Sequence, residues 1–433
     1  MAATVPALSD VQATLCILLI LMVPLAIGGL ALMNTGFVRS RSAAHAMLST
    51  LCAVAVAAIA YFAVGFAIEG YAGGPVHAIS IGGKPWNLLG AEKLFFRGLE
   101  FDLSPASLAA LLQFFGVGLA AAIPLGGAVD RWRLGPSIAS TALLAGCVYP
   151  LFAHWAWGGG WLAQLGVNYS LGSGFLDCGG AGAIQAVGGL SALAMLWILG
   201  PRRGKYSAEG IPAAIPGHNS VLVLFGCLLA LPGWVGLNSA GAILFAGAAP
   251  ARVVLIAANT VLSASGSALI CLLITRIRFG KPDASLVANG WVGGLVASCA
   301  GAAFLSPMAA LLIGVVAGAL VTFSIQWLEL IAVDDTSGSF SVHGLCGLWS
   351  LLAAGLFARV PGAASGQWMA QVVGIATLLG FILPLSYGLN LLLDRVLPQR
   401  VPPEGERHGM DLYELGAGAY PELVTYNEEF MQH

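Results

Sequence analysis

Long apolar stretches dominate the chain, and short segments rich in proline, glycine or charge separate them. Most of these stretches reach the ~20 mostly apolar residues that a helix needs to cross the hydrocarbon core of a bilayer. We predict eleven membrane-spanning helices, at residues 11–34, 43–69, 106–128, 136–158, 179–200, 218–238, 252–275, 285–304, 307–331, 342–358 and 369–394. The first stretch lacks the basic n-region and the clean cleavage site of a secretory signal, so we expect it to remain as a span.

Composition supports an all-α membrane protein and excludes several functions. Hydrophobic residues make up 58% of the chain and charged residues only 9%, against roughly 25% charged in soluble domains. A net charge of −2 leaves no basic surface for nucleic acid. The eight cysteines are scattered singly without metal-ligand spacing, so we expect neither metal nor cofactor. Motifs of hydrolases, metalloproteases and phosphate-binding loops are missing, so we predict that the protein is not an enzyme.

The basic residues predict an orientation in the membrane. With the N-terminus outside, most of the 18 Lys and Arg residues fall in cytoplasmic loops and in the tail, as the positive-inside rule requires. We therefore expect a multi-pass protein of the cell membrane, with residues 1–397 as the transmembrane domain. Residues 398–433 form a polar cytoplasmic tail that either docks on the inner face or stays mobile.

An internal repeat relates the two halves of the chain. Residues 177–190 and 335–348 share Asp at the start, Gly at +3, a polar side chain at +8, Gly at +12 and Leu at +13. Gly29 and Asn34 in the first span match Gly233 and Asn238 in the sixth. Each copy contains five spans, and because five is an odd number, the second copy enters the membrane in the opposite orientation. This predicts inverted repeats at about 11–200 and 218–358, with an extra eleventh helix. Such repeats place a substrate path at their interface near the midplane.

The polar +8 positions are the first candidates for that path. His343 lies inside an apolar run, and Gln185 is its repeat mate. Ionisable groups inside a membrane are costly and often functional, although a histidine hydrogen-bonded purely for packing remains an alternative. We predict that Gln185 and His343 face each other in a pore.

Two further candidates lie at span ends. Asp177 precedes a glycine-rich helix start, where a carboxylate caps amide groups, and it also favours a nearby cation. For Asp334 and Asp335 we favour capping alone. Trp157 precedes three glycines, and an indole there either belongs to the interfacial belt or holds a small cation on its exposed face.

These residues resemble the ammonium transporter (Amt/Mep/Rh) family along nearly the whole chain. The resemblance lies in the order and spacing of residues 29–36 (GLALMNTG), 153–160 (AHWAWGGG), 175–180 (FLDCGG), 236–241 (GLNSAG), 334–344 and 409–420. It implies an eleven-span protomer, a homotrimer with one pore per subunit, and ammonium as substrate, with methylammonium as a possible second one. It also implies that Trp157 and Asp177 hold the cation in an outer vestibule.

The same resemblance implies departures in the pore. The family has two facing histidines; the second is His343, and the first falls on Gln185. Its phenylalanine gate falls on Leu237 and on Gly116, with Phe115 adjacent. Glutamine has no accessible pKa, so we do not expect a proton relay through Gln185.

Two functions stay open at this point. The first is an ammonium transporter or ammonia channel that conducts past His343 and Gln185. The second is an ammonium sensor with little transport, whose tail signals to a cytoplasmic regulatory protein. The altered histidine pair favours the sensor, and the absence of a fused output domain disfavours it.

Overall fold

The computed structural model describes residues 8–420, which are mostly helical. Its α-helices are α1 (Asp10–Ile20), α2 (Pro24–Phe37), α3 (Ala43–Ala60), α4 (Phe66–Glu69), α5 (Pro105–Ala128), α6 (Leu134–Leu143), α7 (Tyr149–Ala156), α8 (Leu165–Tyr169), α9 (Val187–Leu199), α10 (Ser220–Ala246), α11 (Val253–Phe279), α12 (Ala284–Ser298), α13 (Pro307–Leu330), α14 (Cys346–Phe357), α15 (Gln367–Thr377), α16 (Leu383–Val396) and α17 (Pro403–His408). Turns of π-helix extend or join several of them into longer rods, among them η4 (Ala181–Ala186) before α9 and η6 (Phe340–Leu345) before α14.

The long helices lie where the apolar stretches predicted them. Within the described residues, ten helical segments are long and apolar enough to cross a membrane, and their bounds fall within a few residues of most of the predicted ones. The sixth is longer than expected, since α10 continues to Ala246. The predicted eighth span forms the shorter apolar helix α12, followed by turns. A polytopic helical fold is therefore confirmed.

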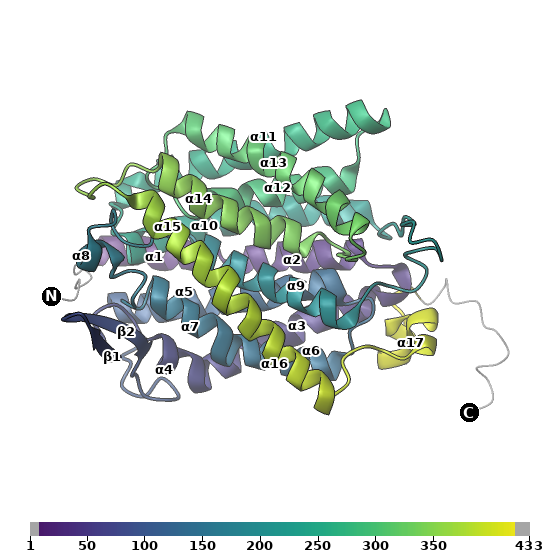
Figure 1. The fold of residues 1–433 in the computed structure, drawn as a ribbon, viewed down its shortest axis with the longest axis horizontal. Coiled ribbons are helices and arrows are strands. Elements are labelled where there is room, and N and C mark those ends of the chain that lie inside the picture. Colours follow the sequence, from purple (N-terminus) through teal and green to yellow (C-terminus); the bar gives the residue numbers. More distant parts are fainter. Residues whose placement is uncertain (1–7, 421–433) are drawn as a thin grey trace.

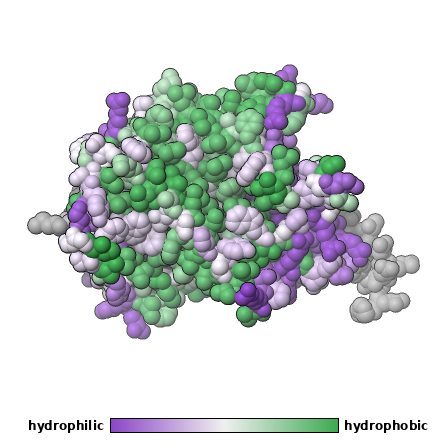
Figure 2. Space-filling model, viewed as in Figure 1, coloured by the Kyte–Doolittle hydropathy of each residue, from purple (hydrophilic) through white to green (hydrophobic). Residues whose placement is uncertain are grey.

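The long helices run side by side between two ends of the molecule (Figure 1). The hairpin β1–β2 lies at one end, and α17 lies at the other. Figure 2 shows apolar residues across the middle of the visible face and polar residues gathered towards both ends. Large side chains such as Leu51, Leu228 and Leu330 are exposed on the helices, which is the surface expected where lipid replaces water.

The two-stranded sheet is a feature that the all-helical prediction missed. β1 (Val76–Ile81) pairs antiparallel with β2 (Lys84–Gly90) in the long loop before α5. The turn is Gly82-Gly83, and both residues have positive φ angles, of 59° and 75°. Two glycines between runs that can form strands are a hairpin signal, but this signal is independent of the hydropathy that predicts spans.

Glycines allow the helices that begin the two proposed repeats to cross closely. A Cβ atom on Gly29 of α2 would lie 2.5 Å from the carbonyl oxygen of Gly226 on α10, and one on Gly226 would lie 2.5 Å from that of Gly29. Further along, Asn34 donates to the carbonyl of Ala122 at 3.1 Å, and Asn238 donates to Ser298 Oγ at 2.9 Å. Both asparagine side chains are thus buried in the core and donate hydrogen bonds there.

The described part of the tail docks on the rest of the chain. Asp411 accepts the backbone N–H groups of Ala44 and His45 at 3.1 and 2.7 Å, at the start of α3. Gly409, with φ of +100°, packs against the backbone of Arg41 so tightly that a Cβ atom would lie 2.5 Å from the Arg41 oxygen. Of the two behaviours expected for the tail, residues 398–420 show docking; residues 421–433 lie outside the described residues.

Candidate functional site

Two carboxylates cap the π-helical turns that carry the candidate pore residues. Asp177 accepts the N–H groups of Ala181, Gly182 and Ala183 at 2.6, 2.9 and 3.0 Å. Asp335 accepts those of Ser339 and Phe340, both at 2.8 Å. Burial raises the pKa of each carboxyl to about 6, and these backbone donors oppose the rise. Asp177 and Asp335 therefore have the same structural role: each caps backbone N–H groups that begin four residues after it in the chain.

Gln185 and His343 contact each other, as predicted, and they do so in the core; that they line a pore stays a prediction. The Nδ1 atom of His343 lies 2.7 Å from Oε1 of Gln185, and both side chains are buried. An amide oxygen only accepts, so the imidazole donates from Nδ1 and carries its lone pair on Nε2. The Nε2 amide group of Gln185 is buried without a hydrogen-bond partner in the described residues. The pair thus offers two groups to a small molecule: the unpaired amide NH2 of Gln185 as a donor and Nε2 of His343 as an acceptor.

The matched glycines at +12 bring this pair together. Gly189 faces the backbone of His343 and Gly344, and a Cβ atom at 189 would clash with the nitrogen of Gly344. A Cβ atom at Gly347 would lie 2.6 Å from the carbonyl of Ala181 and 3.0 Å from the nitrogen of Ala186. Each repeat copy therefore uses its glycine to approach the π-helical turn of the other copy. This crossing explains why the +8 side chains touch.

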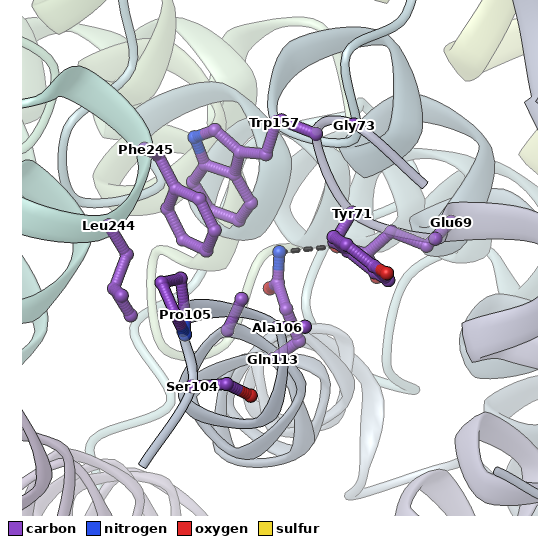
Figure 3. A pocket seen from close by; sticks show the side chains of 13 residues that line it. Glu69, Tyr71, Gly73, Ser104, Pro105, Ala106, Gln113, Trp157, Leu244 and Phe245 are labelled. Carbon is purple, nitrogen blue, oxygen red and sulfur yellow. Dashed lines mark hydrogen bonds between the residues drawn. The ribbon is translucent and has the colours of Figure 1, made fainter. Parts of the chain in front are cut away.

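Trp157 lines a cavity of about 270 Å³ near the hairpin end, which we call the Trp157 cavity. The other lining side chains include Phe245, Tyr71, Glu69 and Gln113 (Figure 3). The indole stacks on the ring of Phe245, with centroids 4.5 Å apart, and its N–H donates to the backbone oxygen of Asp177 at 2.6 Å. The ring is only 6% exposed, so the expectation that the three glycines expose it is wrong. Those glycines allow the chain to turn tightly around His154.

Glu69 supplies the carboxylate of this cavity. Its Oε2 accepts from the Tyr61 hydroxyl at 2.8 Å, and its Oε1 accepts from the Gln113 amide. The Tyr149 hydroxyl donates to the oxygen of the same amide. Within residues 8–420 no Lys, Arg or His forms an ion pair with Glu69. Asp177, by contrast, does not line the cavity and uses both oxygens for capping.

The two predicted gate residues do not line the Trp157 cavity. Leu237 is buried at 1% exposure, and Phe115 is partly buried against the core. Gly116 lies beyond Gln113 on α5, and a Cβ atom there would lie 2.8 Å from the Tyr149 hydroxyl and 3.2 Å from Ile184. Tyr149, which donates to Gln113 of the cavity wall, and Ile184, which precedes Gln185, thus both pack on Gly116. Roles for Phe115 and Leu237 in the pore stay a prediction.

Comparison with known proteins decides the family. The model of the Ammonium Transporter Family matches residues 13–420. The chain belongs to that family.

Several relatives span nearly its whole length. Ammonium transporter Amt2 of Archaeoglobus fulgidus is 35% identical, with 93% of this chain and 86% of that one covered. The ammonium transporter of Bacillus subtilis is 30% identical, with 94% and 97% covered. Among solved structures, Sensor Amt Protein superposes with a TM-score of 0.83 at 27% identity, covering 93% of this chain and 98% of that one. Mep2 of Candida albicans superposes with a TM-score of 0.79 at 24% identity, covering 96% and 91%, which shows the shared fold.

This ammonium transporter family member also has a buried ionic network near the tail. Asp334 pairs with Arg202 at 2.8 Å and with Arg131 at 3.8 Å, and Arg202 also contacts Asp130 at 3.3 Å. Burial raises the pKa of Asp334, but the two guanidinium groups outweigh burial and hold it well below its usual value. Capping is therefore correct for Asp335 and wrong for Asp334, whose carboxylate ties the loop after α9 to the loop before η6.

Sequence reasoning about this family member missed Glu69, Gln113 and Phe245. Glu69 and Gln113 had the same signal as His343, a polar side chain within or at the end of an apolar run. Neither has a repeat mate, so the internal repeat does not point to them. Phe245 lay beyond the predicted end of the sixth span at 238, whereas α10 continues to Ala246.

Proposed function

We propose that this ammonium transporter family member binds ammonium in the Trp157 cavity and passes it as neutral ammonia between Gln185 and His343. The observation that carries the proposal is the hydrogen bond of 2.7 Å between these two side chains. The pair is buried among apolar residues, where an ion is far more costly than a neutral molecule. A conduit of this composition favours ammonia over ammonium.

The cavity supplies what the cation needs before it enters. Glu69 places a carboxylate without a basic partner at one wall, and Trp157 stacked on Phe245 places aromatic rings at another. Cation–π attraction is worth roughly 0.5–2 kcal/mol, and a cation beside the Glu69 carboxylate would stabilise its ionised form, because the site is partly shielded from water. Asp177 contributes indirectly, because its backbone oxygen fixes the Trp157 indole.

Conduction then separates the proton from the nitrogen. Ammonium in the cavity gives up one proton to the outer water and becomes ammonia, and ammonia takes up a proton again in the cytoplasm. Between these events, the free N–H of Gln185 donates to the nitrogen lone pair, and His343 Nε2 accepts one N–H. Gln185 cannot carry a proton at physiological pH, so no relay accompanies the molecule.

Uptake of labelled methylammonium by proteoliposomes tests this function. We expect saturable uptake by the wild type, a raised KM in Glu69→Gln, and a strongly reduced rate in His343→Ala. Uptake no faster than in protein-free liposomes would overturn the proposal.

An ammonium sensor is the second candidate. The superposition on a protein named Sensor Amt Protein and the docked tail favour it. In that case ammonium would protect the amide hydrogens of residues 403–415 from exchange without any uptake. A separate cytoplasmic regulatory protein would then read the tail, because the described tail holds only short helical turns.

Assembly and topology complete the proposal. We propose eleven crossings, with α12 and its following turns as the eighth, an external N-terminus and a cytoplasmic tail in the cell membrane. The two copies are inverted repeats, and three chains form a homotrimer whose contacts bury part of the exposed apolar surface. Native mass spectrometry of the detergent-extracted protein tests the trimer, and a monomer in mild detergent would contradict it.

A further inference from the structure

A second cavity, of about 460 Å³, lies at the end of the molecule opposite the hairpin. Three separate segments line it: the loop after α2, the loop after α9, and α17. Its charged lining residues are Arg39, Arg41, Arg203, Arg407, Glu404 and Glu406. We call it the arginine cavity.

The walls of the arginine cavity are fixed by hydrogen bonds rather than by the arginines themselves. Glu406 accepts the backbone N–H of Arg203 at 2.6 Å and the Arg400 guanidinium at 3.0 Å. Asp411 holds the start of α3, and Gly409 packs on the backbone of Arg41. The three segments are therefore held together without ion pairs from most of the guanidinium groups that line the cavity.

The charges around this cavity do not balance. In the neighbouring buried network, each of Arg131 and Arg202 has a carboxylate partner. In the arginine cavity, the side chains of Arg41, Arg203 and Arg407 have no carboxylate within ion-pair distance among residues 8–420. Glu406 is shared with Arg400. A surplus of positive charge consequently faces the hollow.

Arg39 differs from these three arginines, because it lies within ion-pair distance of two carboxylates but lacks hydrogen bonds at two nitrogens. Its Nε lies 3.5 Å from Asp130 and its Nη2 lies 3.9 Å from Glu406. Both nitrogens are buried and have no hydrogen-bond partner in the described part of the chain. Buried donors without an acceptor are costly; because these two nitrogens are closed off from the cavity, an anion there would act on Arg39 through its charge rather than through hydrogen bonds to them. The positive-inside rule explains arginines at this end, but not a walled cavity with unused N–H groups.

We propose that the arginine cavity binds a phosphate-bearing anion that bridges the tail helix α17 to the loops after α2 and α9. Guanidinium groups present forked N–H donors that match phosphate oxygens, which makes phosphate the best-fitting class. The phosphate group comes either from a soluble phosphate compound or from the headgroup of an anionic phospholipid in the inner leaflet. In both cases the ligand ties the tail to the membrane domain, so its occupancy regulates tail docking.

Binding measurements on the full-length protein test this proposal and distinguish the two sources. Inorganic pyrophosphate is titrated calorimetrically into protein in phosphatidylcholine nanodiscs. Phosphatidylglycerol binding to delipidated protein is followed by native mass spectrometry, with phosphatidylcholine as reference. We expect saturable binding in at least one arm, and slower amide exchange in residues 403–415 when the ligand is bound.

Three variants localise the binding. Arg203→Gln and Arg407→Gln each remove one exposed guanidinium and should weaken binding by about tenfold or more, since hydrogen bonds to charged groups are worth ~1.5–3 kcal/mol. Arg395→Gln is the matched control, because Arg395 is exposed at the end of α16 and does not line the cavity. No saturable binding of either probe would overturn the proposal, as would equal weakening by Arg395→Gln and Arg203→Gln. These results do not depend on ammonium uptake, so the site and the proposed function can fail separately.

Discussion

His343 Nδ1 donates to Gln185 Oε1 at 2.7 Å, which leaves this imidazole with its lone pair on Nε2. In this orientation the amide oxygen of Gln185 accepts and never takes the proton, so the hydrogen bond places the His343 proton on Nδ1. The two side chains thus line the proposed conduit with polar groups but cannot relay a proton. This relationship is the basis of the first prediction.

Replacing Gln185 by histidine should create a second titratable group next to His343. We expect Gln185→His to produce a transient current on ammonium addition that the wild type lacks, because two imidazoles can share and pass a proton. Solid-supported membrane recording on proteoliposomes measures this current. Gln185→Asn is the control, since a shorter amide adds no titratable group; a current in both variants or in neither counts against the relay argument.

Glu69, rather than Asp177, should determine the affinity for the cation. Removing the charge in Glu69→Gln should raise the KM for methylammonium about tenfold or more, because a charge-assisted hydrogen bond is worth ~1.5–3 kcal/mol. Glu100→Gln serves as control, because this exposed carboxylate lies in the segment between β2 and α5 and does not line the cavity. An unchanged KM in Glu69→Gln would remove Glu69 from the site.

Asp177→Asn should act differently, through stability. Asp177 accepts three backbone N–H groups with two oxygens, and an asparagine oxygen cannot satisfy all of them. We expect a loss of ~1–3 kcal/mol, seen as a lower unfolding temperature in detergent. Normal thermal stability with a raised KM would instead assign Asp177 to direct cation binding.

The contrast between Asp177 and Glu69 shows which features of the site can be predicted from the sequence. Span positions, the Asp177 and Asp335 caps and the Gln185–His343 contact follow from hydropathy and from the repeat, because both are local patterns with a fixed period. Which carboxylate lines the cavity depends on where α5, α7 and the end of α10 meet, and no local pattern encodes that. The hairpin was signalled by Gly82-Gly83, but a search for apolar spans does not register it.

The glycine crossing between the two halves should tolerate no side chain. Gly189→Ala places a methyl group against the backbone of Gly344, and overpacking of this kind costs ~1–3 kcal/mol. Gly388→Ala is the control, because no atom lies within 4 Å of its Cβ position. Thermal unfolding in detergent should show a clear drop for the first variant; equal stability of both would contradict the close crossing.

The ionic network around Asp334 should stabilise the fold above the acidic range. Arg202 and Arg131 keep the folded-state pKa of Asp334 below its unfolded value of ~3.9. The stabilisation is therefore present above about pH 4 and is lost as pH falls through the folded pKa. We expect Asp334→Asn to lose ~3–5 kcal/mol at pH 7, as when a buried pair is broken. The deficit relative to the wild type should shrink at pH 3; a constant deficit would contradict the assignment.

The central claim is that ammonia crosses without net charge through the conduit at Gln185 and His343. Simultaneous recording of current and internal pH in wild-type proteoliposomes after an ammonium jump tests it most directly. The account predicts internal alkalinisation faster than in protein-free and His343→Leu liposomes, with no protein-dependent current. A wild-type current that scales with the ammonium flux would contradict it.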